Sequence, residues 1–134
     1  MSRERFTERQ ADARNAAARL LEATTQPESD IVRDAVIQRF EFSFALVWKA
    51  LKLYLERQGH ECGGPRPTLK KAFAEGLITA PDEADIWLQM LEDRNLTSHA
   101  YDEALAKRIY RHVVQDYATL LGGMADKIQS LTWD

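Results

Sequence analysis

The segment from about Asp30 to Gln58 constrains the fold most, because its apolar residues recur with the period of an α-helix. A core stripe on one side comprises Phe40, Phe44, Val47, Trp48, Leu51 and Leu55. A second apolar stripe, on another side, comprises Phe42, Leu46 and Leu53. This is more apolar surface than one packing face requires, so the pattern predicts a central helix buried on two sides, either inside a bundle or against another subunit.

The rest of the chain also has helical spacing. Helices are predicted at about residues 3–23 and 68–75, from 82 into the run 94–101, and from 102 onward. No segment shows strand alternation or a hairpin signal. The fold class is therefore expected to be all-α, an antiparallel bundle of about five helices in a single domain over residues 1–134. Helical spacing also makes Trp48, Leu51 and Trp87 core residues rather than stacking platforms.

Local signals place the helix ends. The expected N-caps are Asp30, Thr68, Asp82 and Asp102. Pro81 is expected just outside the fourth helix, and Gly76 is expected to end the third. The pair Gly122 and Gly123 is expected to bend or end the last helix.

A loop is expected at residues 59–67, where three Gly and two Pro break any regular pattern. It contains His60 and Cys62, but a metal site needs more ligands at recognisable spacing than these two. We expect both side chains to face solvent, and we expect neither a metal nor a cofactor.

Composition limits the classes of function. The chain has 18 Lys and Arg against 21 Asp and Glu, a net charge of -3, so it lacks the bulk positive charge of a nucleic-acid-binding protein and any RNA contact must be local. The single cysteine, Cys62, excludes an intrachain disulfide, and the polar start lacks a signal-peptide core. No apolar run has the roughly 20 residues of a membrane span, so a soluble, cytoplasmic protein is expected.

The run from Arg94 to Tyr101 carries the candidate chemistry, because it gathers a permanent cation, a base and a phenol where a helix is expected to end. The guanidinium of Arg94 fits phosphate oxygens, and the imidazole of His99 exchanges protons near neutral pH. Arg94 follows Trp87 by seven residues, so it lies on the apolar face and needs an anion or an acceptor. The alternative is a helix C-terminus that carries Arg and His to complement its dipole.

Spacing limits how Arg94 and His99 act together. In a continuous helix five residues turn through about 500°, which leaves the two side chains roughly 140° apart. Either the helix stops before His99 and a turn redirects this side chain, or a second copy of the chain completes the site across a twofold interface.

These residues resemble the R-x4-H-x-Y signature of HEPN domains, here Arg94, His99 and Tyr101. Further segments are similar to the nucleotidyltransferase substrate-binding protein branch, also called HepT-like: residues 39–44, 48–55, 67–73, 76–78, Trp87 and 93–99. The resemblance spans about residues 36–120. It implies a helical homodimer that acts beside a separate minimal nucleotidyltransferase, usually as a toxin-antitoxin pair.

The resemblance also implies roles for residues. Arg94 and His99 would be the catalytic pair of a metal-independent ribonuclease, brought together at a dimer interface. Asn95 and Asp93 would be supporting residues, with Asn95 orienting the phosphate or Arg94. Tyr101 would accept a nucleotide from the partner enzyme, which silences the toxin.

Two alternatives remain open beside the ribonuclease toxin. One is a non-catalytic subunit that binds nucleotide or substrate for the nucleotidyltransferase, and the other is a purely structural helical dimer. The acidic balance favours the first alternative, since Glu92 and Asp93 beside Arg94 would weaken RNA binding. These carboxylates would then pair with Arg94 or with a basic surface of the partner.

Overall fold

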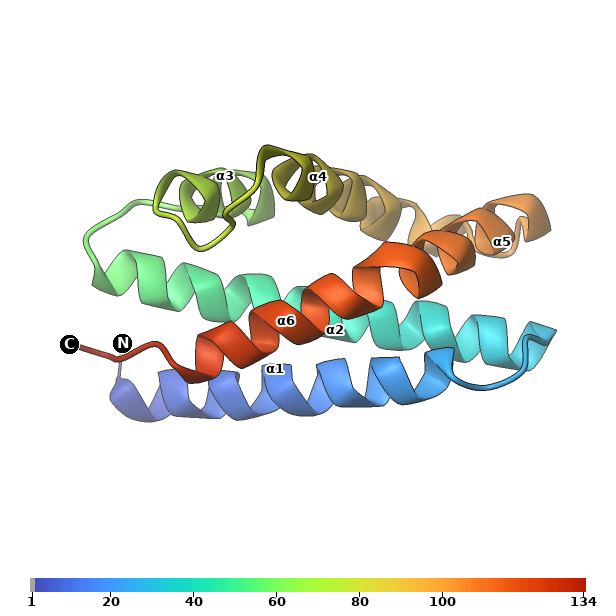
Figure 1. The fold of residues 1–134 in the computed structure, drawn as a ribbon, viewed down its shortest axis with the longest axis horizontal. Helices are drawn as coiled ribbons and strands as arrows, with labels where there is room; N and C mark the ends of the chain where they lie inside the picture. Colours follow the sequence, from blue (N-terminus) through green and yellow to red (C-terminus); the bar gives the residue numbers. More distant parts are fainter. Residues whose placement is uncertain (1) are drawn as a thin grey trace.

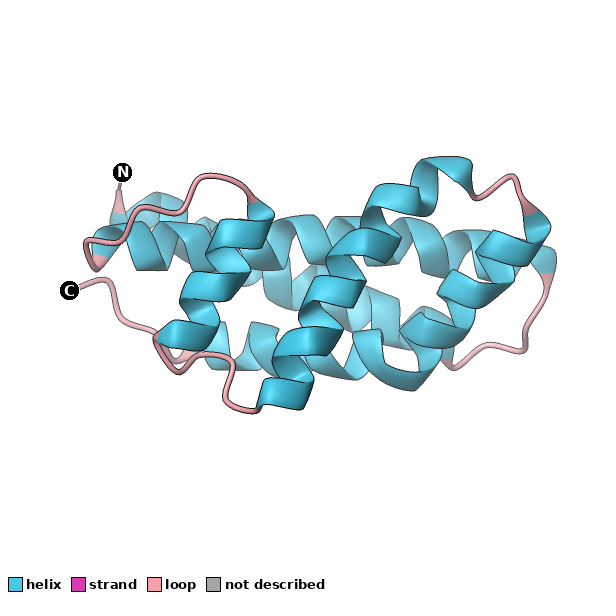
Figure 2. Cartoon of the chain, turned by 90° about the horizontal axis from the view of Figure 1, so that it is seen from above, coloured by secondary structure: helices cyan, strands magenta, loops and turns pink. Residues whose placement is uncertain are grey.

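The computed structural model describes residues 2–134, and every regular element in that range is helical (Figures 1 and 2). The fold is therefore all-α, as the sequence predicts. Its elements are α1 (Arg3–Thr24), α2 (Asp30–Arg57), α3 (Pro65–Ala74), α4 (Pro81–Leu96), the short 3-10 turn η1 (Thr97–His99), α5 (Glu103–His112), the π-helical turn η2 (Val113–Tyr117) and α6 (Ala118–Gln129). Because α5, η2 and α6 follow without a break, residues 2–134 form five helical segments, the last of which comprises α5, η2 and α6.

Helix α2 is the centre of the bundle. It packs against α1, α3, α5 and α6, and α1 also packs against α6 (Figure 1). Five residues of the predicted core stripe are buried, namely Phe40, Phe44, Val47, Leu51 and Leu55, whereas Trp48 is only partly buried and lies at the edge of this core. Trp87 of α4 is fully buried in the same core, so the structural roles of Trp87 and Leu51 are confirmed.

The second apolar stripe of α2 is divided between two environments. Leu53 is buried, in a small cluster with Phe6 of α1 and Trp133 near the C-terminus, so the chain itself covers this residue. Phe42 keeps 52% of its surface exposed, and Leu46 is partly buried. At Leu53 the expected second-side burial therefore takes place inside the bundle, whereas Phe42 remains as apolar surface that the chain does not cover. The cluster around Leu53 also explains why the two termini lie at the same end of the molecule (Figure 1).

Three of the expected N-caps are wrong by one to four residues. Ser29 rather than Asp30 caps α2, because its side chain accepts a hydrogen bond from the backbone N–H of Val32 at 3.1 Å. Helices α3 and α4 begin at prolines, Pro65 and Pro81, which have the backbone angle of a first helical residue and lack the N–H that a cap would satisfy. Asp102 caps α5 as predicted.

Two glycine predictions have different outcomes. Gly76 follows α3 with a φ of +81°, a backbone conformation that favours glycine, and this ends the helix as expected. Gly122 and Gly123 lie inside α6, which continues through both of them to Gln129. The irregularity in the last helical segment is instead the π turn η2, which no residue type in the sequence marks.

The loop before α3 also differs from expectation at one residue. Cys62 is buried against the core rather than facing solvent, and this burial raises the pKa of its thiol. His60 is half-buried and lies 3.1 Å from Glu75. In residues 2–134 no helix is long and apolar enough to cross a membrane.

Candidate functional site

The C-terminal end of α4 redirects the chain between Arg94 and His99. The α-helix ends at Leu96, and residues 97–99 form a 3-10 turn. The hydroxyl of Thr97 donates to the carbonyl of Arg94 at 2.7 Å, and the N–H of Ala100 donates to the carbonyl of Thr97 at 3.1 Å. These bonds satisfy carbonyls that the helix end would leave free. The α-helix therefore stops before His99, and the turn that follows carries this side chain.

The two polar side chains at the end of α4 differ in exposure. Arg94 is half-buried on the face that also carries Trp87, as its spacing predicts. Asn95, the next residue, is exposed. Because Arg94 lies at the end of the helix, its guanidinium can reach the edge of the core without being enclosed in it.

His99 and Tyr101 form an exposed pair beyond the 3-10 turn. Tyr101 keeps 85% of its surface exposed, and its hydroxyl lies 3.5 Å from Nδ1 of His99. The two rings meet edge to face, with their centroids 6.0 Å apart. An aromatic side chain with this exposure contributes little to the core, so its position favours a role toward a ligand or a partner.

A groove lies beside this pair, between η1 and the N-terminal half of α2. Its volume is about 580 Å³, and Thr97, Ala100 and Tyr101 line one side of it. The α2 side contributes the polar residues Asp34, Gln38 and Glu41. The two carboxylates make this groove acidic, which disfavours a phosphate and favours a cationic group.

Asp93 points away from this groove, toward α5 and η2, and it is buried. Its Oδ2 accepts a hydrogen bond from the Tyr117 hydroxyl at 2.6 Å and lies 2.7 Å from Nδ1 of His112. Arg108 lies 3.8 Å from Oδ1, and Gln89 donates to the Tyr117 hydroxyl at 3.0 Å. These contacts compensate the burial of a carboxylate, which would otherwise be costly. Asp93, which the sequence predicts to support Arg94, is therefore part of a separate hydrogen-bond network, on another side of α4 from Arg94.

Burial and the bond to Asp93 raise the pKa of Tyr117 far above its usual value. The phenol therefore keeps its proton and acts as a donor to the carboxylate. His112 presents Nδ1 to the same oxygen, and because a carboxylate only accepts, this nitrogen carries a proton. The other ring nitrogen of His112 is then free to contact solvent or a ligand.

The π turn η2 makes this convergence possible. His112 and Tyr117 are five residues apart, so a regular α-helix would hold their side chains roughly 140° apart around its axis. In a turn whose hydrogen bonds join residues five apart, the two side chains lie on one face, and here their rings meet edge to face with centroids 5.8 Å apart. The prediction from sequence missed His112, Tyr117 and Arg108, because it assumed an unbroken helical period in this region.

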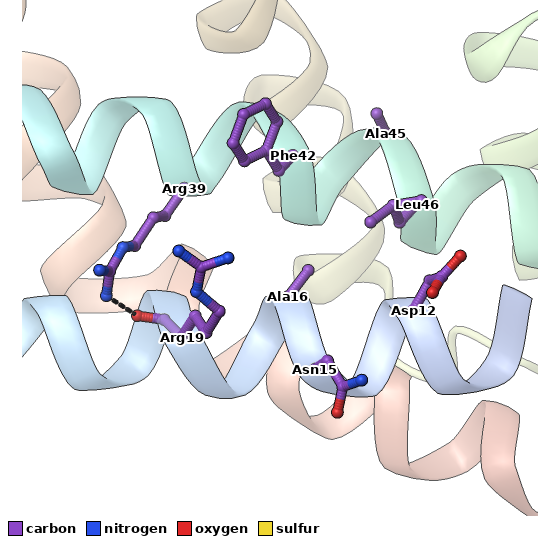
Figure 3. Close-up of a pocket in the computed structure, with 8 residues that line it drawn as sticks. All are labelled: Asp12, Asn15, Ala16, Arg19, Arg39, Phe42, Ala45 and Leu46. Carbon is purple, nitrogen blue, oxygen red and sulfur yellow. Dashed lines mark hydrogen bonds between the residues drawn. The ribbon is translucent and has the colours of Figure 1, made fainter.

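A second groove, with a volume of about 380 Å³, lies between α1 and α2 on the surface that exposes Phe42 (Figure 3). Its apolar lining includes Ala16, Ala45 and Leu46. Arg39 spans the two helices at one end and donates to the carbonyl of Arg19 at 2.8 Å. The groove is therefore mainly apolar, with charged residues at its ends.

Metal-ligating residues are dispersed over residues 2–134. In this range no three His, Cys, Asp or Glu side chains are grouped closely enough to hold a metal ion. His60 pairs with Glu75, and the nearby Cys62 is buried, so the loop residues considered from sequence have structural contacts.

Comparison with known proteins now identifies the family. Residues 8–130 match the model of the family described as "Nucleotidyltransferase substrate binding protein like". The chain belongs to this family. The HEPN-like, HepT-like relationship suggested by the R-x4-H-x-Y motif is thereby confirmed.

Two relatives agree with this membership in the nucleotidyltransferase substrate-binding protein-like family. A Haemophilus influenzae protein named "Probable ribonuclease HepT" is 30% identical over 95 residues, which are 64% of this chain and 63% of that protein. The chain thus matches less than two thirds of this curated relative's length. A crystal structure of a protein from Thermus thermophilus is 39% identical, with a TM-score of 0.78 over 87% of this chain and 98% of that one.

Proposed function

We propose that this protein is the ribonuclease member of a toxin-antitoxin pair, that it cleaves RNA without a metal, and that its partner is a minimal nucleotidyltransferase. The observation that carries the proposal is the end of α4, where Arg94 and an exposed His99 lie on either side of a helix stop. The Haemophilus influenzae relative, which is named a probable ribonuclease, supports it. The family description supports the partner.

The chemistry needs one proton acceptor, one proton donor and a cation. His99 takes the proton from a ribose 2′-hydroxyl, whose oxygen attacks the adjacent phosphorus. The bond from phosphorus to the 5′-oxygen breaks, that oxygen receives a proton from a second acid, and a cyclic phosphate remains. Arg94 stabilises the negative charge that grows on the phosphate oxygens.

A homodimer supplies the second acid, since two copies bring two His99 side chains to one cleft. The apolar groove between α1 and α2 is the contact surface that we propose, because Phe42 is a large side chain left half exposed there. A closed twofold dimer places the same residues on both sides of the cleft.

Tyr101 is the proposed site at which the partner switches the activity off. Its hydroxyl is exposed and 3.5 Å from Nδ1 of His99, so a nucleotide joined to the phenolic oxygen would cover the imidazole. Transfer forms a bond from this oxygen to the α-phosphorus of a nucleoside triphosphate and releases pyrophosphate. The phenolic proton leaves through a neighbouring base, for which His99 is within reach.

One observation favours a second function, a non-catalytic subunit that holds substrate for the nucleotidyltransferase. The groove beside Tyr101 is lined by Asp34 and Glu41, which repel an RNA strand and attract a basic segment of a partner protein. In that case the segment from Arg94 to Tyr101 is an interface.

The test is RNA cleavage by purified protein freed of any modification, assayed in EDTA. We expect wild-type protein to cleave and both His99→Ala and Arg94→Ala to lose activity, because acid-base catalysis alone contributes about 10²–10⁴-fold. Circular dichroism and light scattering should show that both variants keep the fold and the dimer. If the unmodified protein cuts no RNA, and His99→Ala only weakens binding of the nucleotidyltransferase, the substrate-binding function is correct.

A further inference from the structure

Helix α5 carries a strongly basic surface in a protein whose overall charge is negative. Its exposed side includes Lys107, Arg108 and Arg111, and its only acidic residue is Glu103 in the first turn. The net charge of the whole chain is -3. Local positive charge of this kind is what the composition requires of any RNA contact in this protein.

The three cations are available to a ligand. The side chains of Lys107 and Arg108 keep 46% and 47% of their surface exposed, and Arg111 is also exposed. Lys107 pairs with Glu103 at 2.9 Å across one turn of the helix, but an ion pair in water is weak, so a phosphate can displace the carboxylate. Arg111 follows Lys107 by four residues and Arg108 by three, which places the three side chains on one face.

Asp93 of α4 contacts two side chains of this basic face, Arg108 and His112, and so fixes their positions. The buried carboxylate lies 3.8 Å from a guanidinium nitrogen of Arg108 and 2.7 Å from Nδ1 of His112. The carboxylate thus holds both side chains beside α4, while 47% of the Arg108 side chain and 30% of the His112 side chain stay exposed. Arg108 and His112 are four residues apart, so both can contact one phosphate group.

The position of α5 connects this face to the proposed active site. Asp102, the N-cap of α5, accepts from Leu105 and donates its own N–H to the carbonyl of His99 at 3.0 Å. The basic helix therefore starts directly at the turn that carries His99 and Tyr101. A strand of RNA that crosses His99 can continue along α5.

From these observations we infer that the exposed face of α5, formed by Lys107, Arg108, Arg111 and His112, binds the phosphate backbone of single-stranded RNA. The inference rests on the proposed ribonuclease function and names the surface that holds the substrate. Arg side chains bind carboxylates nearly as well as phosphates. The competing ligand is therefore an acidic segment of a protein, and the test must distinguish it from RNA.

The test measures binding rather than cleavage, so it does not depend on catalysis. A fluorescent single-stranded RNA of mixed sequence is titrated with the His99→Ala protein, and anisotropy is recorded from 50 to 200 mM NaCl. Into this protein we introduce Lys107→Gln, Arg108→Gln and Arg111→Gln together. The matched control carries Arg3→Gln, Arg5→Gln and Arg14→Gln, three exposed arginines of α1.

We expect the α5 variant to bind RNA about tenfold or more weakly. The slope of log affinity against log salt concentration should be shallower by about 2, because the variant loses three cations and each phosphate contact contributes roughly 0.7 to the slope for single strands. The α1 control should bind like the parent. A variant with only Lys107→Gln and Arg111→Gln, which leaves the contacts of Asp93 intact, should show an intermediate loss, so that misfolding is not mistaken for lost binding.

Equal weakening by the α5 and α1 variants would overturn the inference, because the effect would then be that of net charge. Unchanged RNA binding by the α5 variant, with lost binding of the nucleotidyltransferase, would overturn it in favour of an acidic protein ligand. If wild-type protein binds RNA through α5 but cuts none, the surface stands and the ribonuclease proposal fails, so the two are distinguishable.

Discussion

At the scale of single residues, Asp93 and Arg94 show how neighbours on one helix end serve different purposes. Arg94 is half-buried, whereas Asp93 is buried and bonded to Tyr117 and His112. The sequence suggested both residues as parts of one site, because their proximity along the chain is visible and their directions are not. One residue of helix turns the side chain by about 100°, which is enough to separate the two environments.

Tyr117→Phe tests the network at this scale. The substitution leaves the buried carboxylate of Asp93 with one partner fewer, so we expect the free energy of unfolding at pH 7 to fall by about 1–3 kcal/mol. Chemical denaturation followed by circular dichroism measures this loss. A change of less than a few tenths of a kcal/mol would show that the hydrogen bond to Asp93 does not stabilise the fold.

The pH dependence of stability gives a second test of Tyr117. Its pKa is raised in the folded protein by burial first and by the bond to Asp93 second, so the unfolded chain loses the phenolic proton at lower pH than the folded one. The stabilisation is complete below the unfolded pKa, about 10, and declines above it by about 1.4 kcal/mol per pH unit. Between pH 10 and 11 the unfolding free energy of wild type should therefore fall more steeply than that of Tyr117→Phe. Parallel curves would contradict this assignment.

At the scale of elements, the sequence predicts the number and type of helices well and their ends less well. Burial of an apolar face contributes most of the stability of a helix, and this face is visible in the sequence as a period of apolar residues. The all-α prediction therefore succeeds. Caps depend on a few local bonds, and Pro65 and Pro81 start helices without any cap side chain. The π turn at residues 113–117 has no sequence signature, so the convergence of His112 and Tyr117 could not be predicted.

Helix packing predicts different costs for two tryptophans. Trp87 of α4 has no exposed surface, so Trp87→Ala should lower the unfolding free energy by about 3–5 kcal/mol. Trp48 is only partly buried at the edge of the core, so Trp48→Ala should cost clearly less. Thermal and urea denaturation of the two variants provide the comparison, and a larger loss for Trp48→Ala would mean that another subunit buries this ring.

At the scale of the whole molecule, the central expectation is assembly. The twofold dimer that we propose would bring two copies of His99 together, and the half-exposed Phe42 in the α1–α2 groove is the proposed contact (Figure 3). Sequence identified this excess of apolar surface but included Leu53, which the chain's own Phe6 and Trp133 cover. Whether Leu53 or Phe42 stays exposed depends on the long-range contact between the two termini, and the period of apolar residues along one helix cannot predict such a contact.

Light scattering tests the dimer. Wild-type protein should have twice the chain mass of 15.3 kDa, and Phe42→Glu should give the single-chain mass, because two charges cannot be buried at a twofold contact. Ile31→Glu is the control, since Ile31 is 82% exposed outside the groove and should leave the dimer intact. A wild-type monomer at micromolar concentration would remove the second half of the proposed active site.

The most direct test combines intact mass with RNA cleavage on the same preparation, made by co-expression with the minimal nucleotidyltransferase that we propose as the partner. We predict a mass increased by one or more nucleotides on Tyr101, no cleavage in this state, and metal-independent cleavage once the nucleotide is removed. Tyr101→Phe should carry no added mass and should cleave RNA in the presence of the partner. Unmodified wild-type protein that remains inactive toward RNA would contradict the account.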